Sequence, residues 1–227
     1  MSGIEALYPF LYSSDGDDDG AAGRDAAVRD RVFEEVRRST REKTAEIAAL
    51  REQVIATQAD ALVACATAVA RTFAAGGRLF AFGNGGSSTD AQAVATMFAA
   101  PDLADAAGTG LPATALTADV AVLTALSNDV SFEVVFARQL AAAGRPGDVA
   151  LGLSTSGNSA NVLRAFAEAR RQGMVSVGLA GYDGGRMAEA GTVDHLFVVP
   201  SASVHRIQEA QTTLYQVLGE LVFRALA

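Results

Sequence analysis

Residues 149–161 read VALGLSTSGNSAN, an apolar run that opens into a loop of hydroxyl residues, glycine and asparagine. The apolar run predicts a buried β-strand, and the spacing of Val162, Phe166 and Ala169 predicts a helix after the loop. Free N–H groups and the positive dipole end of that helix would attract an anion. The alternative is an ordinary helix cap, but one cap does not need four hydroxyls. We therefore predict a phosphate site formed by Ser154, Thr155, Ser156 and Ser159.

A second loop of the same design lies upstream. Residues 78–82 (RLFAF) predict a strand, residues 83–90 (GNGGSSTD) form a glycine-rich loop, and the Ala-rich residues 91–100 predict a helix. Ser87, Ser88 or Asp90 is expected to cap that helix. The loop matches neither the Walker motif nor the dinucleotide fingerprint G-x-G-x-x-G. Two loops at the ends of two strands predict one shared ligand crevice.

Composition limits the possible functions. The 227 residues are enough for one α/β domain with extra helices, and half of them are hydrophobic. A net charge of −8 without a basic patch argues against direct nucleic-acid binding. The one cysteine, Cys65, lies in an apolar helical stretch and is expected in the core, which fits a reducing cytoplasm. No apolar stretch of membrane-spanning length is free of charges, so we expect no membrane association.

Three regions follow one another along the chain. Residues 1–24 combine an apolar cluster with an acidic, glycine-rich linker (SSDGDDDGAAG, 13–23). Residues 25–75 contain no Gly or Pro and show helical apolar spacing, which predicts two or three amphipathic helices at an interface between subunits. Residues 76–227 alternate strand, loop and helix, which predicts a parallel sheet covered on both faces. The expected strands are 78–82, 112–117, 149–153, 175–180 and 195–199, and the expected helices are 88–99, 131–143, 159–172 and 203–226.

At these residues the chain resembles the sugar isomerase (SIS) domain family, and within it the phosphoheptose isomerases. The resemblance covers about residues 40–227. The segments that carry it are AGGRLFAFGNGGS (75–87), SND (127–129), GRPGDVALGLSTSGNSANV (144–162), GYDGG (181–185) and HRIQEAQ (205–211). It implies an α/β fold with a five-stranded parallel sheet between helices, preceded here by a helical extension, and a homotetramer with sites at subunit interfaces.

The resemblance also implies a set of binding residues. The family's phosphate-binding positions fall on the four hydroxyl residues of the 154–159 loop. Its sugar-contacting positions fall on Asn84, Ser87, Asp129 and Gln208, with Gly85 in the same loop. A phosphorylated sugar is thus the implied ligand, and conversion of sedoheptulose 7-phosphate to a heptose 7-phosphate is the implied reaction.

Three departures from the family pattern concern catalysis. The helix after GNGGS carries Ala93 where the family has an inward His, and Met97 where it has the Glu that serves as general base. The last helix carries Gln216 in place of a catalytic His. Zinc-binding members use these positions together with the one at Gln208, so we expect neither that metal site nor another cofactor here.

Aldose–ketose isomerisation needs a base at carbon and a group that moves protons between oxygens. Met97 and Gln216 supply neither. Glu209, next to Gln208, is our first candidate for a replacement, although it could instead pair with Arg206 or a backbone donor. His205, expected as a phosphosugar contact, and Asp90, Asp129 and Glu220 are the other candidates.

Three functions are compatible with these residues. The first is a phosphosugar isomerase with rearranged acid and base groups. The second is a binding scaffold without catalysis, similar to the bacterial DnaA initiator-associating protein. The third is a phosphosugar-sensing regulator, which would need a DNA-binding helix-turn-helix and a basic character that residues 1–75 lack.

Overall fold

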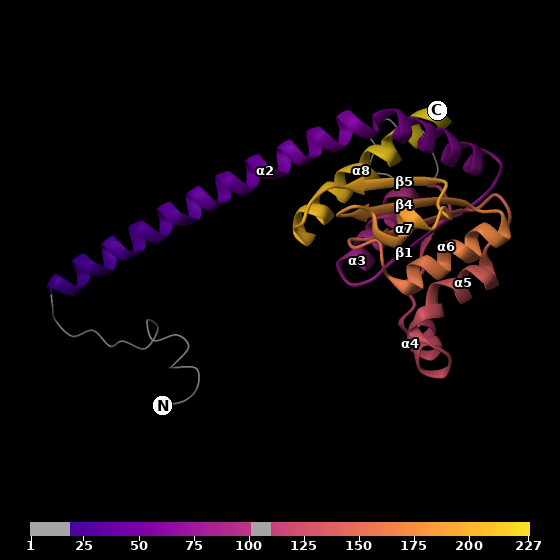
Figure 1. The fold of residues 1–227 in the computed structure, drawn as a ribbon, viewed down its shortest axis with the longest axis horizontal. Helices are drawn as coiled ribbons and strands as arrows, with labels where there is room; N and C mark the ends of the chain where they lie inside the picture. Colours follow the sequence, from indigo (N-terminus) through magenta and orange to yellow (C-terminus); the bar gives the residue numbers. More distant parts are fainter. Residues whose placement is uncertain (1–18, 101–109) are drawn as a thin grey trace. The chain divides into compact units, whose positions relative to one another are not determined.

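Five parallel strands form one sheet in the order β2-β1-β3-β4-β5 (Figure 1). The computed structural model describes residues 19–100 and 110–227. The strands are β1 (Leu79–Gly83), β2 (Ala113–Ala115), β3 (Val149–Ser154), β4 (Val175–Gly181) and β5 (His195–Val199). All five predicted strands are therefore confirmed, each within two residues at either end.

The strand register places the two glycine-containing loops side by side. In the parallel pairing of β1 with β3, Gly83 lies opposite Leu153, so Asn84 and Ser154 follow at the same edge of the sheet. Every residue of β1 and of β3 is buried. Burial on both faces explains why these strands are continuous apolar runs without alternation.

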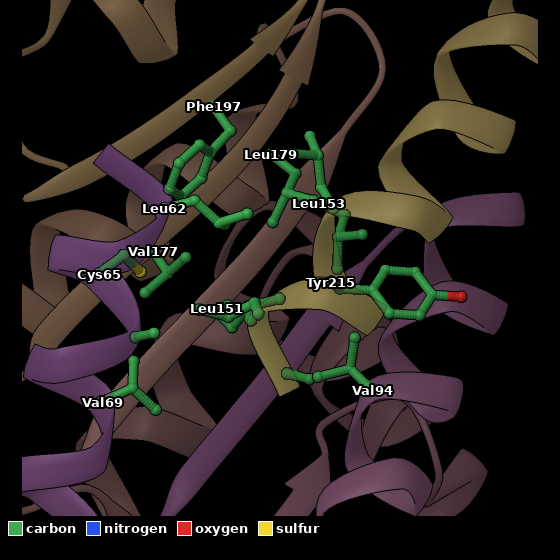
Figure 2. Packing of buried hydrophobic residues seen from close by; sticks show 14 of the residues in the cluster. Leu62, Cys65, Val69, Val94, Leu151, Leu153, Val177, Leu179, Phe197 and Tyr215 are labelled. Carbon is green, nitrogen blue, oxygen red and sulfur yellow. The ribbon is translucent and has the colours of Figure 1, made fainter. Parts of the chain in front are cut away.

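Helices cover both faces of the sheet. They are α2 (Asp19–Ala74), α3 (Gly86–Ala99), α4 (Val120–Asp129), α5 (Val135–Ala143), α6 (Ala160–Gln172), α7 (Gly185–Glu189) and α8 (Val204–Leu226), with a 3₁₀ turn, η2 (Phe132–Val134). On one face the C-terminal part of α2, with α3 and α8, packs against residues such as Leu151, Leu153 and Val177 (Figure 2). On the other face α5 and α6 pack against residues such as Phe80 and Phe82. The α/β fold with a five-stranded parallel sheet is confirmed.

Helix α2 is continuous over 56 residues, where the sequence pattern predicts two or three helices. No Gly or Pro interrupts residues 25–75, so nothing in the local chemistry breaks the backbone hydrogen bonds. The helix begins at Asp19, inside the predicted linker; the apolar cluster of residues 1–12 lies outside the described residues.

The chain divides into two units, Met1–Glu46 and Ile47–Ala227. In the second unit α2 contributes Leu62, Cys65 and Val69 to the core, and Cys65 is fully buried as expected (Figure 2). Burial raises the pKa of the Cys65 thiol to about 12, which disfavours the reactive thiolate at neutral pH. In the first unit the large apolar side chains of the described part of α2 are exposed; they are Val28, Val32, Phe33 and Val36.

Helix α4 is absent from the predicted elements. Its first turn is fixed by Asp119, whose carboxylate accepts a hydrogen bond from the Val122 N–H at 3.0 Å. None of its residues is fully buried, and Leu123 and Leu126 are only partly buried where they pack against the core. The predicted helix at 131–143 is also split, because Ser131 caps the 3₁₀ turn η2 before α5 begins.

Among the described residues, α2 holds one stretch long and apolar enough to cross a membrane. Asp60 and Arg71 lie in the apolar half of α2, and the run between them is too short to span a membrane, so the expectation of no charge-free stretch of spanning length is not contradicted. The core helix of a soluble protein passes the same test, and Leu62, Cys65 and Val69 pack against the sheet here.

Candidate functional site

The loop after β3 keeps its hydroxyl groups at the start of α6. Ser154, the last residue of β3, is buried, and its Oγ lies 3.0 Å from the Oγ of Ser159. Ser159 occupies the N-cap position of α6 but forms no side-chain cap hydrogen bond. The interpretation as an ordinary helix cap therefore does not account for the Ser159 hydroxyl. The 13-residue helix presents the positive end of its dipole to this loop.

The turn and short helix that follow β4 donate hydrogen bonds to the hydroxyl loop, residues 154–159. The Gly157 carbonyl accepts a hydrogen bond from the Met187 N–H at 2.9 Å, and the Asn158 side chain accepts one from the Arg186 N–H at 3.0 Å. Gly157 has a φ of 65°, and a Cβ there would overlap the carbonyl oxygen of Gly184. Only glycine thus fits between the hydroxyl loop and the turn that follows β4.

The loop after β1 begins α3 without a side-chain cap. Gly85 is the N-cap residue, with a φ of 56°, and Asp90 lies inside the helix. The prediction that Ser87, Ser88 or Asp90 caps α3 is wrong, because the glycine conformation turns the chain directly into the helix. Ser87, predicted as a sugar contact, is buried in the first turn.

A pair of asparagines joins the two loops. The Asn84 amide donates to the Asn161 oxygen at 2.8 Å, and the Asn161 amide donates back to the Asn84 oxygen at 2.9 Å. Asn161 is buried, and its oxygen also accepts from the Val162 N–H. Sequence reasoning missed Asn161, although a polar residue on the apolar side of α6 was a visible sign. The two loops form one site through this pair.

Gln208 reaches the same place from α8. A Cβ at Gly86 would overlap the Gln208 amide, so this side chain lies against the first turn of α3. The structure thus brings Asn84, Gly85, Ser87 and Gln208 to one end of α3, beside the 154–159 loop.

The other sequence candidates have different surroundings. The Asp129 carboxylate, at the end of α4, is exposed and accepts a hydrogen bond from the neighbouring Asn128 amide at 2.8 Å. The Glu209 carboxylate pairs with the Arg206 guanidinium at 2.6 Å, which is the alternative that the sequence left open. His205 is exposed in the first turn of α8.

Apolar or uncharged groups occupy the three positions where the family resemblance expects His and Glu. Ala93 and Gln216 are exposed, and Met97 packs against α8, since a Cβ at Gly219 would lie 2.6 Å from its Cε. Within residues 19–100 and 110–227, no group of three or more His, Cys, Asp or Glu is arranged to hold a metal ion. The expected lack of an active-site zinc stays a prediction.

A titratable pair lies in the interface between α3 and α8. The Tyr215 hydroxyl donates to the Asp90 carboxylate at 3.4 Å, and burial raises the pKa values of both side chains. In the described part of the chain, Asp90 Oδ2 and both amide atoms of Gln211 are buried without a hydrogen-bond partner. Buried polar groups in this state call for a functional or solvent-based explanation.

Comparisons with known proteins agree with this architecture. Residues 44–181 match the SIS domain family. The phosphoheptose isomerase of Roseiflexus sp. (strain RS-1) is 46% identical over 177 residues, which cover 78% of this chain and 88% of that protein. That of Paramagnetospirillum magneticum is 43% identical over 182 residues, covering 75% of this chain and 93% of the relative. The solved phosphoheptose isomerase of Neisseria gonorrhoeae superimposes with a TM-score of 0.75 at 34% identity, covering 82% of this chain and 98% of its own.

Proposed function

This chain belongs to the SIS domain family and is similar to phosphoheptose isomerases, and from that premise we propose that it binds a phosphorylated sugar. The phosphate is held by Ser154, Thr155, Ser156 and Ser159 at the start of α6. The sugar lies toward Asn84, Gly85, Ser87, Asp129 and Gln208. The observation that supports this proposal most directly is the Asn84–Asn161 hydrogen-bonded pair. It joins the hydroxyl loop and the glycine loop at one edge of the sheet.

Replacing Ser156 by Ala is expected to weaken binding of sedoheptulose 7-phosphate about tenfold or more, because hydrogen bonds to charged groups contribute roughly 1.5–3 kcal/mol each. Among the described residues, the Ser156 Oγ accepts from the Asn158 N–H at 3.2 Å and donates to no group, so its proton is available to an anion. Isothermal titration calorimetry of the wild type and the variant measures this difference.

The control is the unphosphorylated sugar. It should bind both proteins weakly and equally, because it lacks the group that Ser156 contacts. Equal affinity of the wild type for phosphorylated and unphosphorylated sugar would contradict the assignment of the loop.

We propose further that isomerisation of the bound sugar phosphate is weak or absent, and that no metal or other cofactor assists it. Glu209 is the carboxylate nearest to Gln208 in sequence, but its pairing with Arg206 favours a structural role. A binding scaffold similar to the DnaA initiator-associating protein is the second candidate, favoured by the same loss of the base and the His. Proton exchange in deuterated water separates the two, because a scaffold exchanges none. For either role we propose a cytoplasmic protein.

We expect a homo-oligomer, most simply a tetramer, with residues 25–75 in the interface. Val28, Val32, Phe33 and Val36 lie within nine residues of α2 and are about half exposed, which leaves an apolar face for a second copy to cover. Light scattering at micromolar concentration should give the mass of four chains. Phe33→Glu should lower that mass, whereas Glu35→Gln, a change of an exposed polar residue, should not. A monomeric wild type would refute both the assembly and any site shared between subunits.

A further inference from the structure

Three contacts define how α3 and α8 meet. Gln208 lies against Gly86, the Tyr215 hydroxyl is bonded to Asp90, and Met97 lies against Gly219. Asp90, Ala93 and Met97 follow one another at steps of three and four residues, so they share the side of α3 that faces α8. Asp90 is therefore about one turn before Ala93 and two turns before Met97, the positions where the family resemblance places a His and the general base.

Asp90 is a carboxyl group in this interface without a cation beside it among the described contacts. The competing carboxylate, Glu209, is bonded to the Arg206 guanidinium, which stabilises its charge and opposes proton uptake. Asp90 has the Tyr215 hydroxyl on Oδ1 and a buried Oδ2 with no partner in the described chain. The strands under α3 contribute apolar side chains such as Leu151 and Leu153. Figure 2 shows the Tyr215 ring at the edge of this cluster, with its hydroxyl directed away from it.

We propose that Asp90, paired with Tyr215 in the α3–α8 interface, carries the proton in the isomerisation at this site. The inference rests on the proposed function and takes the proposed isomerisation as weak rather than absent, since it names the proton carrier for the same bound sugar phosphate. The Asp90 carboxylate takes a proton from the carbon beside the carbonyl, which leaves an enediol, and returns it to the former carbonyl carbon. The Tyr215 hydroxyl exchanges a proton with the enediol oxygens, so no oxidant, reductant or second substrate is needed.

Two polar groups near this carrier are buried without a partner in the described chain, namely Asp90 Oδ2 and the Gln211 amide. A general base reaches its proton directly or through one water molecule. Gln211 lies three residues after Gln208 and four before Tyr215, so its buried amide faces the same interface between the two contacts with α3. Neither Asp90 Oδ2 nor this amide is engaged by another group in the described part of the chain.

The test is exchange of the carbon-bound proton of sedoheptulose 7-phosphate in deuterated water, followed by NMR. Asp90→Asn should lower the exchange rate at least about 100-fold, the lower range for a positioned base. Tyr215→Phe should lower it less. Asp60→Asn, a change of an exposed carboxylate on α2, should leave it at the wild-type value. The wild-type rate should rise with pH through a pKa above the ordinary range of aspartate, because the base acts when deprotonated and burial favours its protonated form.

Measurements of folding and of binding distinguish a loss of proton transfer from a loss of the folded or ligand-bound state. Asn keeps the size of Asp and an oxygen for the Tyr215 hydroxyl, and it removes a buried carboxylate, so the free energy of unfolding at neutral pH should not fall. Calorimetric affinity for the sugar phosphate should stay within about threefold. Unchanged exchange in Asp90→Asn, a loss in Glu209→Gln instead, or no wild-type exchange despite intact binding would each overturn the inference. Absence of binding in the wild type would instead refute the proposed function.

Discussion

Wild-type turnover of sedoheptulose 7-phosphate is expected to lie about 10²–10⁴-fold below that of a phosphoheptose isomerase with the family's Glu and His, since a positioned acid or base contributes that much. By the family resemblance, Met97 and Gln216 occupy those positions, and neither side chain exchanges protons near neutral pH. The Met97 side chain also fills its place against Gly219, so the carboxylate is replaced by an apolar contact rather than by an opening. Coupled product assays at saturating substrate give the rate.

Placing a carboxylate at position 97 and an imidazole at position 216 should raise the turnover of sedoheptulose 7-phosphate. Met97→Glu with Gln216→His is expected to raise turnover at least about tenfold over the wild type, with Met97→Gln and Gln216→Asn as the matched uncharged control. Gln216 is exposed, so the His replacement needs no repacking, whereas the new carboxylate has room only where the Met97 thioether now lies. A wild type as fast as the family enzymes would contradict the premise that these substitutions matter. A double variant no faster than its control would show that the rest of the site is no longer arranged for isomerisation.

Replacing Gly157 by Ala is expected to destabilise the fold by about 2–5 kcal/mol and to abolish measurable phosphosugar binding. A left-handed backbone costs a residue with a Cβ roughly 1–2 kcal/mol, and overpacking adds typically 1–3 kcal/mol. The new methyl group would overlap the Gly184 carbonyl, so the hydroxyl loop and the turn after β4 would have to separate. Thermal denaturation gives the stability, and calorimetry gives the binding.

Gly191→Ala isolates the backbone part of this effect. Gly191 has a similar φ, 57°, but no atom lies within 4 Å of the position that a Cβ would take there. This control should lose only about 1–2 kcal/mol of stability and keep full binding. If Gly157→Ala bound the ligand as well as the control does, the close fit of the two turns would not be needed for the site.

The amino-acid sequence alone was enough to predict the sheet and its two loops. Strands buried on both faces appear as uninterrupted apolar runs, and the runs of β1 and β3 end in glycines or hydroxyl residues, so these strand ends were visible. The order of motifs was enough to identify the family. The expected departures at Ala93, Met97 and Gln216 also come from the sequence, because the family resemblance assigns these positions without coordinates.

Helix α4 and the exact helix boundaries needed the structure. Helix α4 buries no side chain fully, and its first turn is fixed by the Asp119 cap. Gly85 rather than a polar side chain begins α3, a choice that depends on backbone angles and not on residue preference alone. The structure was also needed to show that α2 is one unbroken helix, because apolar spacing does not show where one helix ends and the next begins.

What the sequence by itself determined is the class of fold, the five parallel strands and the chemistry of the two loops. What only the tertiary structure decided is which side chains meet. Asn84 and Asn161 are 77 residues apart, and Tyr215 and Asp90 are 125 residues apart, so no local pattern connects them. Conversely, Gln208 and Glu209 are adjacent in sequence, yet one lies against Gly86 and the other pairs with Arg206. Successive residues on a helix point about 100° apart, so proximity in sequence does not place two side chains in one site.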